Sequence, residues 1–339
     1  MAVLTDEVLV VNAGSTSLKL TVVDREDRSR NVEALTDAGD VAAVGHRVVH
    51  GGGRFTAPTR IDDEVLAELA EVRELAPLHN TPALRAIEEA RRLLSETPQI
   101  AVFDTAFHAT MPDVATTYLL PRRFRDRGIR RYGFHGLSVA WAAECVPAER
   151  LVVCHLGGGC SVTAVAAGRS VDTTMGFTPL EGVPMATRAG SIDPGALLYL
   201  LRHGVSPQDL DQALEHESGW HALAGTSDME ELLRSASPEA VLALGVFTYK
   251  VAQAVGAMTT ALGGIDALVF TGGIGEHAGP VRTAVCDRLR FLGVELDLHA
   301  NERAAGEISS SHSAVRVHVV PAREDVIVAR AVRRLLRAR

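Results

Sequence analysis

The chain has 339 residues and a mass of 36.1 kDa, which exceeds one average domain and predicts two. A net charge of −8 and a pI near 5.9 argue against bulk binding to nucleic acid or to an anionic membrane, because both need a basic field. Charged residues at 22% and hydrophobic residues at 47% are typical of a folded globular protein and not of a disordered one.

The first predicted elements form a hairpin, with strands at Val8–Val11 and Leu18–Val23 and a small polar tip at Asn12–Lys19. Small residues at such a tip let backbone N–H groups approach phosphate oxygens, although a tip of this kind is more often a simple turn. Of the 34 basic residues only Lys19 and Lys250 are lysine. Lys19 therefore stands out, because a compact charge on a flexible stem suits a phosphate site.

The next segment, His46–Gly53, is an apolar strand that ends in glycines and carries Arg47. Arginine suits bidentate contact with a carboxylate or a phosphate, although one arginine among 32 is more often a surface residue. Two helices are predicted next, at Glu64–Leu75 and at Pro82–Leu94. The second has Thr81 as its cap and a proline as its first residue.

A buried strand at Ile100–Phe103 leads into Asp104, and carboxylates at strand ends of α/β proteins are candidates for acid, base or metal roles. The run Arg122–Arg131 holds six arginines and is predicted to be a solvated loop face. Directly after it, Tyr132–Gly136 is predicted to expose His135 between glycines. The 13 histidines show no H-E-x-x-H or Cys/His grouping, so no zinc site is expected.

The hairpin pattern recurs in the second half of the chain, with strands at Leu151–Cys154 and Val162–Val165 around the glycine-rich tip His155–Ser161. His155 takes the place that Asn12 has in the first unit. A duplicated hairpin, with strands alternating with helices, predicts two related α/β halves.

A third strand is predicted at Ala267–Thr271, followed by a glycine turn at Gly272–Glu276. Arg188 follows a loop rich in proline and glycine. No apolar run is expected to reach the length of a membrane span. Further helices are predicted from Asp193 to an end at Gly204, at Glu239–Leu262 and at Glu324–Leu336.

The four cysteines show no C-x-x-C spacing, and a chain of this size does not depend on disulfides. Free thiols in a reducing compartment are therefore expected. Asp6 and Glu7 leave no basic leader at the N-terminus, so no secretory signal is expected and the predicted location is the cytoplasm.

Together these segments resemble the acetate kinase family, which belongs to the superfamily of sugar kinases, actin and the heat-shock chaperone ATPases. The motifs occur in the family's order and cover most of the chain. They are Asn12–Lys19, His46–Gly52, Leu75–Asn80, Val102–His108, Tyr132–Gly136, Asp172–Pro194 and Phe270–Glu276.

The resemblance implies two duplicated ribonuclease-H-like α/β domains with a cleft between them. Residues 1–149 plus 325–339 would form the N-terminal domain on the acyl-substrate side, and residues 150–324 the C-terminal domain for nucleotide binding and dimerisation. The protein would be a homodimer. Its partners would be small molecules, with no nucleic acid and no membrane.

The activity implied is reversible phosphoryl transfer, dependent on Mg²⁺ or Mn²⁺, between ATP and a short-chain carboxylate such as acetate or propionate. The products would be ADP and an acyl phosphate. Such chemistry needs positioning and dispersed positive charge more than a covalent nucleophile. The resemblance assigns catalysis to Arg47, Asp104, His135 and Arg188, and metal binding to Asn12 and Glu324.

The family pattern also marks residues for the two substrates. It assigns nucleotide binding to Lys19, His155, Leu156, Gly157, Gly158, Gly159, Asp228, Met229, Glu230, Gly273, Ile274, Gly275, Glu276 and His277. It assigns carboxylate binding to Arg47, His79 and an apolar pocket of Val49, Leu78, Phe134 and Pro179. One methylene changes binding in such a pocket by only about 1–3 kcal/mol, so these residues do not settle which acid is used.

The sequence departs from the family mainly on the nucleotide side. Gly158, His277 and Arg323 replace asparagines, Met229 and Glu230 replace Phe-Arg, Ala186 replaces a glycine, and the region Asp24–Val41 is shortened. GTP or pyrophosphate as phosphoryl donor therefore stays open beside simple drift at an ATP site. A non-catalytic nucleotide-binding regulator and an actin-like or chaperone-like ATPase are further alternatives. The complete catalytic set counts against the first, and the carboxylate pocket counts against the second.

Overall fold

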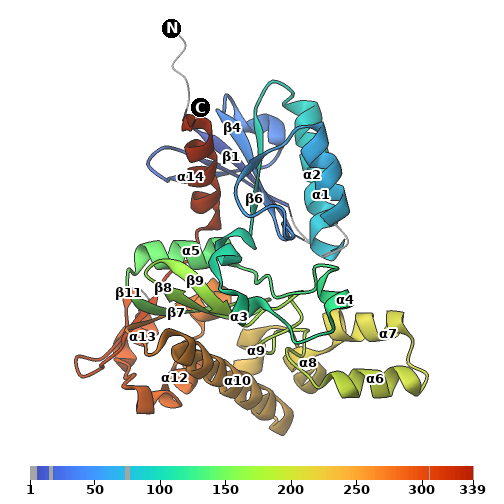
Figure 1. Cartoon of the computed structure of the whole chain (residues 1–339). Helices are drawn as coiled ribbons and strands as arrows, with labels where there is room; N and C mark the ends of the chain where they lie inside the picture. Colours follow the sequence, from blue (N-terminus) through green and yellow to red (C-terminus); the bar gives the residue numbers. More distant parts are fainter. Residues whose placement is uncertain (1–5, 15–17, 73–76, 305, 339) are drawn as a thin grey trace.

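The structure is a computed structural model that describes residues 6–14, 18–72, 77–304 and 306–338, and only the backbone of residues 77–79. It contains two six-stranded sheets, one in each half of the molecule (Figure 1). The first has the order β3-β2-β1-β4-β6-β5, with β1 (Val8–Ala13), β2 (Leu18–Val23), β3 (Ser29–Val32), β4 (Ala43–Val48), β5 (Thr59–Arg60) and β6 (Gln99–Phe103). The second has the order β11-β12-β10-β7-β8-β9, with β7 (Arg150–Leu156), β8 (Cys160–Ala166), β9 (Arg169–Thr173), β10 (Ala267–Thr271), β11 (Gly306–Glu307) and β12 (Arg316–Val319).

The two sheets repeat one topology. In the first, β1 pairs antiparallel with β2 and parallel with β4, and β4 pairs parallel with β6. In the second, β7 pairs antiparallel with β8 and parallel with β10, and β10 pairs parallel with β12. A short antiparallel strand closes each sheet next to its last parallel strand. The predicted duplication of an α/β unit is confirmed.

The helices surround these sheets (Figure 1). The α-helices are α1 (Asp63–Val72), α2 (Pro77–Leu93), α3 (Asp113–Thr116), α4 (Arg122–Arg125), α5 (Gly136–Cys145), α6 (Pro194–Arg202), α7 (Pro207–Gln212), α8 (Gly219–Ala224), α9 (Met229–Arg234), α10 (Pro238–Leu262), α11 (Gly272–His277), α12 (Gly279–Asp287), α13 (Leu298–Arg303) and α14 (Glu324–Arg337). Short 3₁₀-helices lie at Leu35–Ala38, Ala106–Thr110 and Arg290–Leu292, and a π-helix lies at Ala213–Glu217.

Two helices join the halves of the molecule by packing across the chain order. The C-terminal α14 buries Val328 and Val332 in the same cluster as Val8 of the first sheet. Helix α5, which precedes the second sheet in sequence, buries Val139 in one cluster with Val269 of that sheet. The two helices also contact each other at the junction (Figure 1). The division of domains at residues 149/150 and 324/325 stays a prediction.

Helix α10 differs from the expectation that no segment has the length and composition of a membrane span. Among the described helices it is the one that passes that test, with 25 residues. Its inner face buries Phe247, Val251 and Val255 in the core of the second half. Its outer face exposes Val241 and Leu242. The high hydropathy therefore reflects a core helix that is also apolar on its outer side.

Several predicted boundaries were wrong. Helix α2 begins at Pro77, so Pro82 lies inside it. Proline is favoured at the first position of a helix, and both prolines satisfy this preference; the prediction chose Pro82. Gly272–Glu276 forms most of α11 instead of a turn. The glycines have a low helix propensity, but the segment is fixed at its start by the end of the preceding strand. Helix α1 ends at Val72, and the predicted continuation to residue 75 lies outside the described residues.

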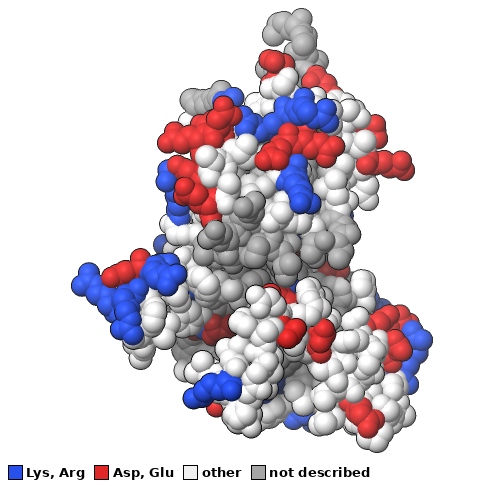
Figure 2. Space-filling view, turned by 90° about the vertical axis from the view of Figure 1, so that its right-hand side faces the viewer, with Lys and Arg blue, Asp and Glu red and all other residues white. Residues whose placement is uncertain are grey.

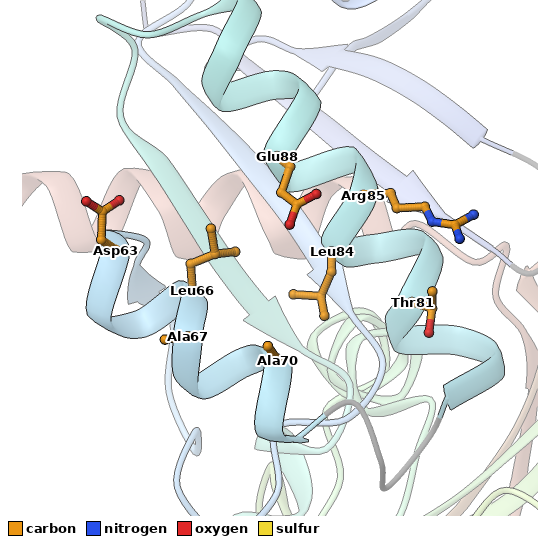
Figure 3. A pocket seen from close by; sticks show the side chains of 8 residues that line it. All are labelled: Asp63, Leu66, Ala67, Ala70, Thr81, Leu84, Arg85 and Glu88. Carbon is orange, nitrogen blue, oxygen red and sulfur yellow. The ribbon is translucent and has the colours of Figure 1, made fainter.

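A groove of about 450 Å³ separates α1 from α2 in the first half (Figure 3). Leu66 of α1 and Leu84 of α2 face one another across it. Arg85 and Glu88 also belong to its lining, and the side chain of Arg85 extends away from α1. It contains none of the predicted site residues whose side chains are described. On the face in Figure 2, basic and acidic side chains lie side by side in the upper part of the molecule and are more scattered in the lower part.

Candidate active site

The centre of the site is an ion pair at the carboxyl ends of two neighbouring parallel strands. Arg47 lies at the end of β4, and Asp104 directly follows β6. Arg47 Nε lies 3.2 Å from Asp104 Oδ1 and Arg47 Nη2 lies 2.5 Å from Asp104 Oδ2. The side chain of Asp104 is only 1% exposed. A carboxylate so deeply buried needs this partner, because an unpaired buried charge is strongly unfavourable.

Both predicted metal residues contact the same arginine. Arg47 Nη1 donates to Asn12 Oδ1 at 3.1 Å, because Asn12 lies opposite Arg47 in the β1–β4 register. Arg47 Nε lies 3.4 Å from Oε2 of Glu324, the first residue of α14. Elements from the beginning, middle and end of the chain therefore meet at one guanidinium.

The charges of this cluster shift its titration. Burial raises the pKa of Asp104 to about 6; Arg47 opposes that rise, and the Glu324 charge adds to it. Burial alone would lower the pKa of Arg47, but the carboxylates of Asp104 and Glu324 raise it above its usual value. Arg47 is therefore a permanent cation, whereas Asp104 titrates just below neutral pH.

The backbone of Asp104 fixes the start of α5 and with it His135. The Gly136 N–H donates to the Asp104 carbonyl at 3.0 Å, and a Cβ at position 136 would overlap that oxygen. His135 itself has φ of +60°, a left-handed conformation that is uncommon for a non-glycine residue and that recurs at functional sites. The expectation of an exposed histidine was wrong, because His135 is half-buried.

His135 stacks on His155, with ring centroids 4.1 Å apart. Burial lowers the pKa of His155 to about 4 and that of His135 well below its ordinary value, so both rings are neutral at pH 7. His135 Nδ1 lies 3.0 Å from Ser161 Oγ. We assign Nδ1 as the acceptor of that hydroxyl, which places the His135 proton on Nε2, beside Gly159. A Cβ at position 159 would lie only 3.1 Å from Nε2.

A cavity of about 530 Å³ opens between the two sheets beside this cluster. Its walls come from both hairpins, from the start of α11 and from the start of α14. The predicted site residues among its lining are Asn12, Lys19, Arg47, His155, Gly157, Gly158, Gly273, Glu276 and Glu324. The residues between Gly14 and Leu18, at the first hairpin tip, lie outside the described residues. The cavity combines glycine backbone, lysine and carboxylate, a composition suited to phosphate and a cation.

Arg188 comes from the loop between β9 and α6. Its Nε donates to Glu215 Oε2 at 2.8 Å, and its side chain is 16% exposed. Sequence reasoning did not identify Glu215, because no motif links it to a residue 27 positions away. The hydroxyls of Ser161 and Ser138, which bind the Nδ1 atoms of His135 and His155, were missed for the same reason.

The predicted adenosine residues lie apart from this cavity. Asp228 caps α9 by accepting from the Glu230 N–H at 2.7 Å, and Met229 is buried in the core of the second half. Glu230 is exposed and pairs with Arg234 at 2.8 Å. The remaining residues that were predicted to bind the nucleotide also belong to the second half of the molecule. Leu156 is buried at the end of β7, Ile274 and Gly275 are buried within α11, and His277 is exposed at its end.

Three residues of the predicted acyl pocket, Val49, Phe134 and Pro179, are buried. The side chains of Leu78 and His79 lie outside the described ones. The loop of Pro179 is held by Arg131, which donates to Glu181 at 2.7 Å.

Arg131 also donates to the carbonyls of Thr173, Thr174 and Met175. The prediction of a solvated run therefore holds for the other five arginines, which are exposed, and was wrong for Arg131, whose side chain is 16% exposed. Four carbonyl and carboxylate acceptors converge on it, and this explains why it leaves the surface.

Comparison with known proteins places this site in a family. The sequence profile of the acetokinase family matches residues 30–330. Acetate kinase from Synechococcus sp. is 47% identical over 316 residues, covering 89% of this chain and 78% of that protein. Propionate kinase from Citrobacter rodentium is 45% identical over 315 residues, with the same shares of 89% and 78%.

The fold agrees with that match. The crystal structure of a propionate kinase from Francisella tularensis superposes with a TM-score of 0.90 at 32% identity, covering 96% of this chain and 98% of that one. The acetate kinase of Porphyromonas gingivalis superposes with a TM-score of 0.86, also at 32% identity, covering 97% and 99% of the two chains. The duplicated domains of the actin-like ATPase superfamily are thereby established for this protein, and the chain belongs to the acetokinase family.

Proposed function

We propose that the cleft transfers the γ-phosphoryl group of ATP reversibly to a short-chain carboxylate, acetate or propionate, and produces ADP and an acyl phosphate. Membership of the acetokinase family makes the protein a kinase that acts on a carboxyl group. The observation that supports our assignment of the site is the contact of Arg47 with Asp104, Asn12 and Glu324 beside the cavity of the glycine tip.

In this reaction a carboxylate oxygen attacks the γ-phosphorus, the bond to the β–γ bridging oxygen breaks, and its electron pair stays on ADP. The transferred group carries charge on three oxygens, so cationic and N–H donors placed around it lower the barrier. In our proposal Arg47 and Arg188 bind the carboxylate and the transferring group. Neutral His135 donates from Nε2, and Asp104 keeps Arg47 oriented.

The residues at the cavity fit a magnesium or manganese ion. Asn12 and Glu324 offer an amide and a carboxylate oxygen beside Arg47, and oxygen is the ligand atom that Mg²⁺ prefers. Mg²⁺ usually keeps several waters and phosphate oxygens, so two protein ligands suffice. When bound, the ion neutralises charge on the β- and γ-phosphate oxygens.

In our proposal the buried apolar residues Val49, Phe134 and Pro179 contact the tail of the acid, and such contacts separate acetate from propionate only weakly. Relatives of this chain carry the names of both acetate and propionate kinases. We propose that both acids are used, since one methylene changes binding by only about 1–3 kcal/mol. An acyl hydroxamate assay over acetate, propionate and butyrate, crossed with ATP, GTP and pyrophosphate, should give most product with ATP and the two shorter acids. No hydroxamate with any pair would contradict the proposal.

The departure at Gly158 leads to a prediction about ATP. Gly158 is exposed at the cavity, and a Cβ there would meet nothing within 4 Å, so an asparagine fits. The Gly158→Asn variant should lower KM for ATP about fivefold, the value of one hydrogen bond of ~1 kcal/mol to a phosphate. Gly158→Ala is the matched control and should leave KM unchanged. Equal KM values in all three proteins would show that position 158 does not reach the nucleotide.

We propose a homodimer formed by the second half of the chain. Helix α6 has no buried residue and exposes Leu198 and Tyr199, and α10 exposes Val241 and Leu242. Apolar side chains gathered on helices in this way are typical of surfaces that another chain covers. Light scattering should give about twice the chain mass for the wild type. The Leu242→Glu variant should shift toward the monomer, and an unchanged dimer would exclude the outer face of α10.

We also propose a cytoplasmic location. The cysteines of the described residues are free thiols, and Cys154, Cys160 and Cys286 are buried. Such unpaired thiols persist in a reducing compartment.

A further inference from the structure

Arg188 is held by a carboxylate that lies on an unusual stretch of helix. Its Nε donates to Oε2 of Glu215 at 2.8 Å, and the two side chains are 16% and 12% exposed. Glu215 is the third residue of the π-helix Ala213–Glu217. This geometry is rare and is frequent at functional sites. The π-helix therefore carries the carboxylate that contacts Arg188.

The π-helix is joined to the loop of Arg188 by hydrogen bonds along both segments. Thr187 Oγ1 donates to the Glu215 carbonyl at 2.8 Å, and the Ser218 N–H donates to the Thr187 carbonyl at 2.9 Å. Farther along, the Trp220 N–H donates to the Met185 carbonyl at 3.2 Å. These contacts join the residues just before Arg188 to Glu215 and the residues after it, so the carboxylate and the backbone of the arginine keep a fixed relation.

Contact through Nε has a chemical consequence for Arg188. A guanidinium carries one donor on Nε and four on its two terminal nitrogens. Glu215 takes the Nε donor, and Nη1 faces the Met185 sulfur at 4.0 Å. A thioether is a weak acceptor, which an anion displaces easily. The terminal nitrogens are the edge that binds a carboxylate or a phosphoryl group in bidentate fashion.

We propose that Glu215 is a positioning residue for phosphoryl transfer: it fixes the orientation of Arg188 before substrate binds and leaves the terminal nitrogens for the transferring group. The inference rests on the proposed role of Arg188. A freed arginine samples many rotamers, and a misplacement of about 1 Å in a reacting assembly costs on the order of a hundredfold in rate.

The test is a comparison of kcat and KM in two variants. Glu215→Ala should lower kcat between about tenfold and a hundredfold, with KM for ATP within about twofold of the wild type. Glu215→Gln keeps an oxygen that accepts from Nε, so it should recover kcat to within about threefold. A purely structural role would instead lower Tm in both variants without separating kcat from KM.

A double variant and a control complete the design. Glu215→Ala combined with Arg188→Ala should be no slower than Arg188→Ala alone, because the carboxylate acts through the arginine. Asp266→Ala removes the ion pair with Arg150, a pair remote from the cavity lining, and should leave kcat unchanged. If Glu215→Ala fails to fold, Glu215→Asp replaces it, since the shorter chain retracts the carboxylate from Nε.

The outcomes separate this inference from the proposed function. Wild-type kcat in Glu215→Ala, or in Glu215→Asp where that variant stands in, overturns the positioning role. If Arg188→Ala is inactive in the same experiment, the proposed function stands without the positioning role of Glu215. Wild-type kcat in Arg188→Ala would overturn both the role of Arg188 and the inference built on it.

Discussion

Replacing Arg188 by alanine should lower kcat by about a thousandfold and leave the protein folded. An arginine that stabilises the charge of a transferring phosphoryl group contributes on the order of 10³ to 10⁵ in rate. Arg188 pairs with Glu215 through Nε and is 16% exposed, so its removal leaves a buried carboxylate with a cost in stability as well. Steady-state kinetics with both substrates measures the loss, and circular dichroism checks the fold.

A control separates the two costs in that experiment. Arg188→Lys keeps the charge beside Glu215 and loses the bidentate edge, so it should restore Tm more than kcat. Activity near the wild type in Arg188→Ala would remove this arginine from the mechanism. Equal recovery of Tm and kcat in Arg188→Lys would reduce its role to that of a point charge.

Asp104→Asn should lower kcat by about a hundredfold and change the pH profile. The asparagine keeps the shape of the side chain but loses the charge that holds Arg47. In the wild type, kcat/KM should fall as the pH drops through about 6, because burial raises the pKa of Asp104 to about that value and protonation releases Arg47. The residual activity of Asp104→Asn should lack this acid limb.

Protonation of Asp104 as the pH falls should affect the stability of the fold and the activity in opposite directions. The folded protein holds the Asp104 proton more tightly than the unfolded chain, whose aspartate has a pKa of 3.8. Between pH 6 and pH 4 the native state therefore binds more protons, and this group stabilises the fold as the pH falls. The acid loss of activity should precede any loss of Tm. An acid limb that follows Tm, or that persists in Asp104→Asn, would contradict the assignment to this carboxylate.

Sequence reasoning predicted the architecture because its signals were local. The two hairpins are separated by about half the chain, yet each shows its strand, glycine tip and strand within a short window, and the sheets repeat one order. Motifs at strand ends also placed Arg47 and Asp104 correctly at two strands. The structure adds that these parallel strands are neighbours, which carries their carboxyl ends to one edge of the sheet. The boundary at Pro82 was wrong because two prolines could start the helix. The boundary at Gly272 was wrong because the tertiary context outweighed the local preference of the glycines.

The contacts that tune the site were beyond sequence reasoning. Glu215, which meets Arg188, lies in a π-helix, and no residue pattern signals a π-helix. Ser161, whose hydroxyl contacts Nδ1 of His135, lies 26 positions away in sequence. The neutral state of His135 itself follows from burial, which the flanking glycines did not reveal. Partners and burial arise from packing, so a single sequence does not carry them.

The most direct test of the central claim is ³¹P NMR of the protein with ATP and Mg²⁺, recorded with and without acetate. A site built to bind a carboxylate should give an acyl phosphate resonance and ADP in the presence of acetate, and almost no inorganic phosphate in its absence. Arg188→Ala should give neither product at a comparable rate. Inorganic phosphate formed equally with and without acetate, and no acyl phosphate, would show that the cleft hydrolyses ATP and would contradict the account.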